Sequence, residues 1–352
     1  MTLLVGTEKG LFRVFAEEAG GRWRIDGPHL AGYPVLHTLA TPGGILYAAT
    51  AHKIWGAHVY ASADGGDTWS ALEGVPQYPT DSGRGATNSI WCLAAAGERL
   101  FAGIDPAGLF VSDDRGGSWQ PVRGLNEHPT RSVWEPSRGC FAVHSVCIDP
   151  ERSANIVAAV SAGGVYRSED GGASWSPANA GVRAENLPTP YPASGHNVHR
   201  LVMHPARPDR LYRQCYHGTW RSDDGGRSWT EITSGLPGNF GYAIGVDPAD
   251  PDTVYQVPES DSLMRTVVDG RLRVYRSRDA GANWTSVSEG LPQAHAWVTV
   301  LREALDTDTN GGIYFGTSGG HLFVSRDGGS QWTLAAGFLP RILSVQAVEE
   351  AP

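Results

Sequence analysis

Histidines recur at one place in the sequence, just before short apolar runs that end at a proline. His144 and His199 each lie six residues before a proline, and His37 lies five residues before Pro42. Histidine makes up only 12 of 352 residues, so three near-equivalent positions exceed what composition predicts. Neutral imidazoles that converge on one point are good ligands for zinc, iron, copper or nickel. The spacing predicts a transition-metal site at His37, His144 and His199.

The same spacing has a purely structural interpretation. Histidines at the starts of strands can hydrogen-bond to loop carbonyls, or stack between neighbouring sheets, without holding a ligand. Both interpretations stay open from the sequence alone.

Further polar and aromatic residues lie in long segments between the apolar runs, where functional loops are common. Carboxylates, histidines and tyrosines there could transfer protons, and an aromatic ring could stack on a sugar. The candidates for catalysis are Glu135, His217, Arg131 and Tyr242, and those for substrate binding are Trp134, Arg183, His196 and Glu259. Glycoside hydrolysis needs two carboxyl groups about 5 to 9 Å apart. The candidates for such a pair are Glu135, Glu185, Glu259 and Asp261.

A repeated motif, Ser-x-Asp-x-Gly-x-(Thr/Ser/Asn/Gln)-Trp, organises the chain. Its copies span residues 62–69, 112–119, 168–175, 222–229, 277–284 and 325–332, with successive aspartates 48 to 56 residues apart. That period is typical of a four-stranded propeller blade. The Ser and Asp side chains can hydrogen-bond within a turn, the Gly permits a positive φ, and the Trp can pack back over the turn. We therefore expect the motif to be structural.

The N-terminal segment supplies a degenerate seventh repeat. Residues 3–7 and 11–15 have the pattern of two strands, and Trp23 stands where a motif Trp would. The missing innermost strand can come from residues 342–348 at the other end of the chain. The sequence thus predicts one domain, residues 1–352, with an all-β fold and almost no helix. The fold is a seven-bladed β-propeller of four-stranded antiparallel blades, closed by pairing of the C-terminal strand with the N-terminal blade.

Topology predicts where a functional site would lie. If the strands of each blade run from innermost to outermost, all the motif turns lie on one face and the long loops on the other. The first residues of the innermost strands then surround the mouth of a central channel on the long-loop face. The candidate histidines and loop residues would meet at that mouth.

The motif resembles the bacterial neuraminidase repeat, or Asp box, of sialidases, xyloglucanase-like hydrolases, sortilin-type receptors and photosystem II assembly-factor relatives. The resemblance implies a propeller fold, and either glycoside hydrolysis or the holding of a partner. Sialidases also resemble one another in a Phe-Arg-Ile-Pro motif of the first blade. The matching stretch in this chain reads Phe12-Arg13-Val14 and lacks the Ile-Pro, which argues against a sialidase.

Composition limits the partners. The net charge of −9 and the isoelectric point of about 5.7 disfavour binding to nucleic acid or to an anionic membrane. The N-terminus has no signal-peptide pattern, and the four cysteines are irregularly spaced, so we expect reduced thiols in a cytoplasmic protein.

Together these features predict a metal-binding enzyme that acts on a small molecule in a histidine-rich pocket. The alternatives are a non-catalytic binding or assembly scaffold and a glycoside hydrolase of the Asp-box type. The expected ligand is a small molecule or a saccharide, a protein partner stays open, and the expected cofactor is one transition-metal ion with no organic cofactor.

Overall fold

The computed structural model describes residues 1–17, 22–52, 54–134, 141–184 and 189–348. Within these residues the strands form seven four-stranded antiparallel sheets, which are the blades of a β-propeller. Apolar and β-branched residues fill the three inner strands of each blade, as expected for strands that are buried on both faces. The predicted fold class is confirmed.

In every blade, strands that follow one another along the chain are hydrogen-bonded neighbours. In blade one, the C-terminal strand is added as the innermost strand. Blade one is β28 (Ile342–Val348), β1 (Thr2–Thr7), β2 (Gly10–Ala16) and β3 (Trp23–His29). Blade two is β4 (Val35–Ala40), β5 (Leu46–Thr50), β6 (Val59–Ser62) and β7 (Ser70–Ala71). Blade three is β8 (Ser89–Ala96), β9 (Arg99–Asp105), β10 (Gly108–Ser112) and β11 (Gln120–Pro121). Blade four is β12 (Val143–Ile148), β13 (Ile156–Val160), β14 (Gly164–Ser168) and β15 (Ser176–Pro177).

The remaining three blades follow the same plan. Blade five is β16 (Val198–His204), β17 (Arg207–Cys215), β18 (Thr219–Ser222) and β19 (Thr230–Glu231). Blade six is β20 (Phe240–Asp247), β21 (Asp250–Glu259), β22 (Tyr275–Ser277) and β23 (Thr285–Ser286). Blade seven is β24 (Leu305–Thr307), β25 (Ile313–Gly316), β26 (Leu322–Ser325) and β27 (Thr333–Ala336).

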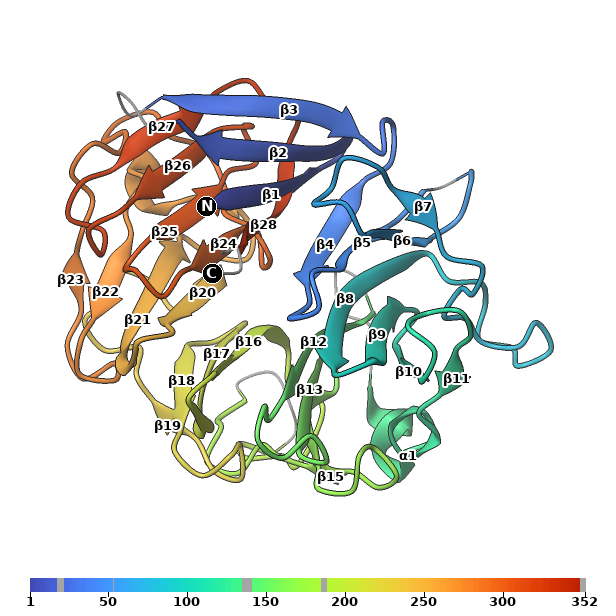
Figure 1. The fold of residues 1–352 in the computed structure, drawn as a ribbon. Helices are drawn as coiled ribbons and strands as arrows, with labels where there is room; N and C mark the ends of the chain where they lie inside the picture. The colour runs from blue at the N-terminus through green and yellow to red at the C-terminus, as the bar shows by residue number, and fades with distance from the viewer. Residues whose placement is uncertain (18–21, 53, 135–140, 185–188, 349–352) are drawn as a thin grey trace. The chain divides into compact units, whose positions relative to one another are not determined.

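Blade one is completed by the two ends of the chain. Strand β28 lies beside β1 and pairs with it antiparallel, with Val345 opposite Val5 and Gln346 opposite Leu4 (Figure 1). Val5 is fully buried and Val345 nearly so. The pairing covers the backbone edge of β1, which would otherwise be open to other strands. The prediction that residues 342–348 supply the innermost strand of this blade is confirmed.

Each motif is a hydrogen-bonded turn between the two outer strands of its blade. In blade four the Ser168 hydroxyl donates to Asp170 Oδ1 at 2.8 Å, and the Gly172 N–H donates to Ser168 Oγ at 2.9 Å. The Ser174 N–H and hydroxyl donate to the same carboxylate, at 2.9 and 2.5 Å. These hydrogen bonds, led by the one from the Ser174 hydroxyl, lower the pKa of Asp170 to about 2. The aspartate is a turn residue, as predicted.

The motif tryptophans have two roles, of which the sequence predicted one. The Trp175 indole N–H donates to the Gly172 carbonyl oxygen of its own turn at 3.0 Å. The Trp332 N–H instead donates to the Val287 carbonyl oxygen, which belongs to the preceding blade, at 2.7 Å. The equivalent bonds from Trp229 and Trp284 reach Ala178 and Ile232, each at 2.8 Å. These three indoles join neighbouring blades.

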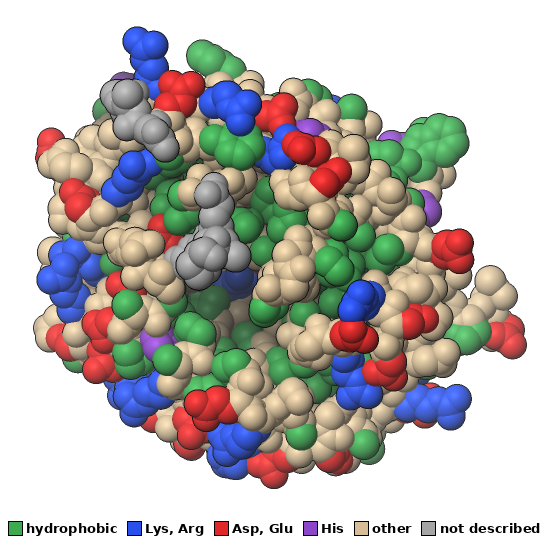
Figure 2. Space-filling model, viewed as in Figure 1, with side chains coloured by type: hydrophobic (Ala, Val, Ile, Leu, Met, Phe, Trp, Pro, Cys, Tyr) green, Lys and Arg blue, Asp and Glu red, His purple; other side chains and the backbone are tan. Residues whose placement is uncertain are grey.

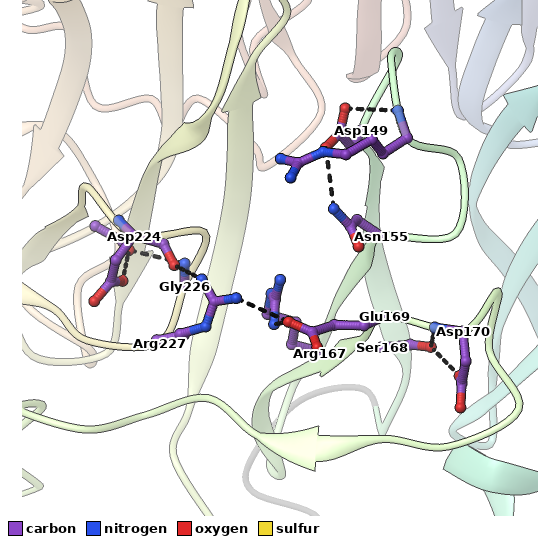
Figure 3. A network of polar contacts seen from close by, with 11 residues as sticks. Asp149, Asn155, Arg167, Ser168, Glu169, Asp170, Asp224, Gly226 and Arg227 are labelled. Carbon is purple, nitrogen blue, oxygen red and sulfur yellow. Dashed lines mark hydrogen bonds and ion pairs between the residues drawn. The ribbon is translucent and has the colours of Figure 1, made fainter.

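Exposed ion pairs add a second kind of link between blades four and five. Arg227 donates to Glu169 Oε1 at 2.8 Å, and Arg167 donates to the same oxygen (Figure 3). The Arg227 and Glu169 side chains are more than half exposed, so solvent screens the attraction. Such pairs contribute little to stability. The indole contacts are therefore the more important link.

The described chain divides into two compact units. Unit 1 consists of Met1–Val35, Tyr212–Arg221 and the chain from Glu231 onward, and unit 2 consists of Leu36–Leu211 and Ser222–Thr230. The core of unit 1 includes Leu3, Tyr255, Phe315 and Trp332, all of them buried. Unit 2 holds two buried clusters, one with Phe101 and Trp134 and one with Tyr47, Tyr78 and Phe110.

Helical structure is confined to three short turns in the described chain. These are α1 (Arg123–Asn126), η1 (Pro129–Val133) and η2 (Val268–Gly270). The prediction of almost no helix is confirmed. None of these helices is long and apolar enough to cross a bilayer.

Three cysteines fall within the described residues, and all three are free thiols: Cys92, Cys147 and Cys215. Burial raises the pKa of Cys92 to about 12 and that of Cys147 to about 11. A thiol that stays protonated is a weak nucleophile. Cys140 lies outside the described residues.

Charged side chains of both signs are interspersed on the face drawn in Figure 2. Outside the atoms drawn in grey, neither sign gathers there into one broad patch. The charge of that face therefore gives no general attraction for a polyanion.

Candidate functional site

Glu259 ends strand β21 with its side chain fully buried. The Thr299 hydroxyl donates to Oε1, and the Val300 N–H donates to the same carboxyl group. The other oxygen, Oε2, is buried without a hydrogen-bond partner. Burial raises the pKa of Glu259 to about 8, although the Val300 N–H and the positive charge of Arg302 act against the rise. The carboxyl group is therefore mostly protonated at neutral pH and carries an unused proton.

A row of aromatic side chains lies beside this carboxyl group. Phe240 on β20 pairs directly with Glu259 across the sheet. The Phe240 ring centroid lies 5.3 Å from that of Tyr242 and 5.6 Å from that of Tyr216. Tyr216 in turn lies 4.7 Å from His217. Strand β20 and the β17–β18 turn thus place four rings in sequence along one side of the site.

Arg302 connects the aromatic row with the carboxyl group. Its guanidinium carbon lies 4.8 Å from the Tyr242 ring centroid, which is within the range of a cation–π contact. Its charge also acts on Glu259, whose pKa it lowers slightly against the effect of burial. The segment before β24 therefore contributes both Thr299 and Arg302 to this site.

The loop after Glu259, residues 260–267, forms a closed turn. The Ser260 N–H donates to the Thr266 carbonyl oxygen at 2.8 Å, and the Arg265 N–H donates to the Asp261 carbonyl oxygen at 3.0 Å. The hydroxyl oxygens of Ser260 and Thr266 are buried without a hydrogen-bond partner, like Oε2 of Glu259. Buried polar groups without partners are rare, and a cluster of them is typical of a place that holds water or a polar ligand.

A family model for the BNR-Asp box repeat matches residues 109–122, which contain most of β10, the second motif and β11. The match falls on the turn whose hydrogen bonds recur in the other five motifs. The chain is an Asp-box β-propeller.

The sequence of this propeller is similar to that of one characterised enzyme over a limited stretch. The xyloglucanase of Hypocrea jecorina (strain QM6a) is 25% identical over 137 residues, which is 39% of this chain and 15% of that protein. The propeller thus matches a small part of the enzyme's length.

Solved structures share the fold of this propeller at low sequence identity. An ancestral GH74 enzyme superimposes with a TM-score of 0.57 at 18% identity, over 88% of this chain but 38% of that one. YCF48 from Cyanidioschyzon merolae gives 0.54 at 13% identity, over 86% of this chain and 84% of that one. YCF48 bound to D1 peptide gives 0.51 at 16% identity, over 82% and 78%.

Three of the predicted site residues come together in unit 1 of this propeller. Tyr242 and His217 belong to the aromatic row, and Glu259 pairs with Phe240 of that row. The sequence analysis expected the candidate residues to share one site but did not single out these three. Another predicted residue, Glu135, lies outside the described residues, as does Glu185.

Trp134 occupies a different environment from the exposed loop that the sequence suggested. The indole is 4% exposed and packs among Tyr166 and Phe141. Its N–H donates to the Tyr166 hydroxyl at 2.6 Å. A Cβ atom at Gly163 would lie 2.9 Å from the indole, so the ring fills space that only a glycine leaves open. The side chain therefore serves the core of unit 2.

The other predicted catalytic and substrate-binding residues within the described chain belong to unit 2. Arg131 belongs to η1, and its Nη2 donates to the Ala107 carbonyl oxygen at 2.6 Å. His196 is buried, with Nε2 2.8 Å from the Pro192 carbonyl oxygen, and Arg183 is exposed. The His196 contact is the kind that a structural histidine makes.

The histidines of the predicted metal site all belong to unit 2. His144 is fully buried, with Nδ1 3.0 Å from Ser145 Oγ, while His199 is buried and His37 is half-buried. Among the residues that the structure describes, no three His, Cys, Asp or Glu side chains form a group that could hold a metal ion. A metal at these histidines stays a prediction.

Arg302 and Thr299 were not predicted from the sequence. Both lie in the segment Trp297–Glu303, which reads as an apolar run until the final Arg302-Glu303 pair. The two charged residues at the end of this apolar run were the feature of the sequence that could have identified Arg302 as a site residue.

Proposed function

We propose that this propeller binds a saccharide at the Glu259 site and hydrolyses it. Glu259 donates its proton to the glycosidic oxygen as the bond breaks, water bonds to the anomeric carbon, and the proton that this water loses restores Glu259. The observation that carries the proposal is the buried, mostly protonated Glu259, whose Oε2 has no partner within the protein. A carboxylic acid held in its neutral form near pH 7 is the usual proton donor of glycoside hydrolases.

The surroundings of Glu259 fit this role. Tyr216 is half-buried and offers aromatic surface of the kind that packs against sugar rings, whereas Phe240 and Tyr242 are buried behind it and hold its ring in place. Arg302 supplies hydrogen-bond donors that suit hydroxyl and ether oxygens. The name of the similar enzyme, a xyloglucanase, supports a saccharide as the ligand.

Oε2 of Glu259 is shielded from solvent, so a ligand reaches it only after a movement, which we assign to the adjacent 260–267 loop. The tip of this loop carries Leu263 and Met264, which are 81% and 59% exposed and so contribute little packing. A loop with few packed side chains can open at low cost in free energy. Displacing it would also release the buried Ser260 and Thr266 hydroxyls to meet a polar ligand.

Calorimetric binding to xyloglucan oligosaccharides and hydrolysis of the glycosidic bonds of the same oligosaccharides test the proposal together. Glu259→Gln should retain binding and lower kcat by about 100-fold or more, which is the usual contribution of a general acid. Glu289→Gln is the matched control, because it makes the same change at an exposed glutamate of unit 1. Absence of both binding and hydrolysis in the wild-type protein would overturn the proposal.

A non-catalytic scaffold is the second candidate. The two YCF48 structures match this chain over most of both lengths, whereas the ancestral GH74 enzyme is much longer than the matched part. One of them is bound to D1 peptide, which supports a peptide as an alternative ligand. Binding of peptides, but of no saccharide, would favour this second function.

A metal-dependent activity on a small molecule would need His37, His144 and His199 to act together in unit 2. Burial of His144 and His199 supports a protected site, but it suits structural histidines equally well. The metal content of the purified protein decides between these interpretations.

A further inference from the structure

Two arginines of unit 2 lie against the same aromatic ring. The guanidinium carbon of Arg84, in the loop between β7 and β8, is 4.7 Å from the Tyr78 ring centroid. That of Arg131, in η1, is 6.0 Å from the same centroid. Arg131 is also 5.1 Å from Trp134 and 5.7 Å from Phe141. Tyr78 therefore contacts both positive charges, and Arg131 contacts two further aromatic rings.

The polar contacts of these arginines are with neutral groups. Arg84 Nη1 donates to the Asn126 carbonyl oxygen at 2.9 Å, and Arg131 Nη2 donates to the Ala107 carbonyl oxygen at 2.6 Å. Arg131 Nη1 is buried without a hydrogen-bond partner. Neither arginine forms an ion pair with any carboxylate in the described part of the chain.

Among the described residues, no carboxylate compensates these two like charges, which lie in a partly desolvated place. Burial lowers the pKa of Arg131, and the nearby charge of Arg84 adds to that effect. Aromatic faces attract each cation, but they leave the N–H edges of a guanidinium group unused. Such edges match the two oxygens of a carboxylate or a phosphate, and the interaction strengthens where water is excluded.

We propose that Arg84 and Arg131 bind an oxyanion, the carboxylate or phosphate group of a small ligand. An anion between the two guanidinium groups would remove their repulsion and supply the missing partner of Arg131 Nη1. The fixed contacts to the Asn126 and Ala107 carbonyl oxygens hold both side chains ready for it. The inference rests on unit 2 alone and is independent of the function proposed for Glu259.

Isothermal calorimetry with inorganic phosphate and with D-glucuronate tests the site, with D-glucose as the uncharged counterpart. Wild-type protein should bind at least one of the two anions and bind D-glucose at least tenfold more weakly. Binding of phosphate alone indicates a phosphate ester as the natural group, and binding of D-glucuronate alone indicates a carboxylate. Added sodium chloride should weaken binding in either case.

Arg84→Gln and Arg131→Gln should each weaken anion binding by tenfold or more. Arg207→Gln is the matched control, because Arg207 is an exposed arginine at the start of β17 in unit 2. Arg84 is tied to the fold by a single hydrogen bond, so its variant keeps the test valid if Arg131→Gln does not fold. Failure of both anions to bind the wild-type protein, or unchanged binding in Arg84→Gln, would overturn the proposal.

Discussion

The Thr299 hydroxyl donates to one oxygen of Glu259 and leaves the other oxygen without a partner. A protonated carboxyl group fits this asymmetry, because its carbonyl oxygen accepts one hydrogen bond and its O–H remains available to donate another. The raised pKa of this buried carboxyl group determines how its contribution to stability depends on pH.

Glu259→Gln should make the protein more stable at alkaline pH and less sensitive to pH. The folded-state pKa is raised to about 8, whereas a glutamate in the unfolded chain ionises near pH 4.3. Unfolding therefore releases a proton between about pH 4.3 and 8, so a rise in pH through this window lowers the free energy of unfolding, by on the order of a few kcal/mol. The amide cannot ionise and avoids this loss.

Urea denaturation at pH 5 and pH 8.5 measures that difference. The wild-type protein should lose stability between the two values, Glu259→Gln should lose less, and Glu289→Gln should follow the wild type. Equal pH dependence in all three proteins would mean that Glu259 is ionised in the folded state.

Asp170→Ala should lower the midpoint of thermal unfolding and leave ligand binding unchanged. The alanine removes the acceptor of hydrogen bonds from Ser168 and Ser174, and the Asp-box turn loses its closure. The folded-state pKa of about 2 lies below that of an unfolded aspartate, about 3.9. The contribution of Asp170 is therefore fully present above about pH 4 and is lost as the pH falls toward 2.

Calorimetric melting curves at pH 3 and pH 7 check this prediction. Replacement of the exposed Asp81 by alanine is the control and should change little. If Asp170→Ala and Asp81→Ala melted alike at pH 7, the turn would not depend on its aspartate.

Removal of β28 should prevent stable folding of blade one. A chain that ends at Arg341 exposes the backbone of β1 and the buried faces of Leu3 and Val5. We expect loss of a cooperative thermal transition and aggregation in size-exclusion chromatography. The milder Ile342→Ala should cost about 2–5 kcal/mol, since Ile342 is fully buried against Gly316. A cooperative, monomeric truncated chain would contradict this role of β28.

Protein purified without an affinity tag or chelator should contain near-stoichiometric zinc, iron, copper or nickel if His37, His144 and His199 form a site. Elemental analysis measures it, and the paired substitution His144→Ala and His199→Ala should abolish the metal with little loss of stability. A protein with no metal that takes none up on titration would contradict the prediction. A large fall in melting temperature of the double variant would assign the histidines a structural role.

The sequence determined the repeat and, through it, the fold. Six serine–aspartate–glycine–tryptophan turns at a nearly constant spacing predict hairpins, because each hairpin is closed by hydrogen bonds among residues within eight positions of one another. The pairing of β28 with β1 also followed, since the N-terminal repeat has only the outer strands of a blade. The hydrogen bonds within a turn and the number of strands can be predicted directly from the spacing of residues in the sequence.

The tertiary structure alone decided which side chains meet and which are buried. Trp134 turns inward because Gly163, far from it in sequence, leaves room for the indole. Arg84 and Arg131 share the Tyr78 ring although 47 positions separate them. Glu259 gains its neutral carboxyl group from burial beside Thr299 and Val300, which β21 meets only in the folded chain. Desolvation and contact between distant segments determine these burials, contacts and protonation states. Neither can be predicted from the spacing of residues along the chain.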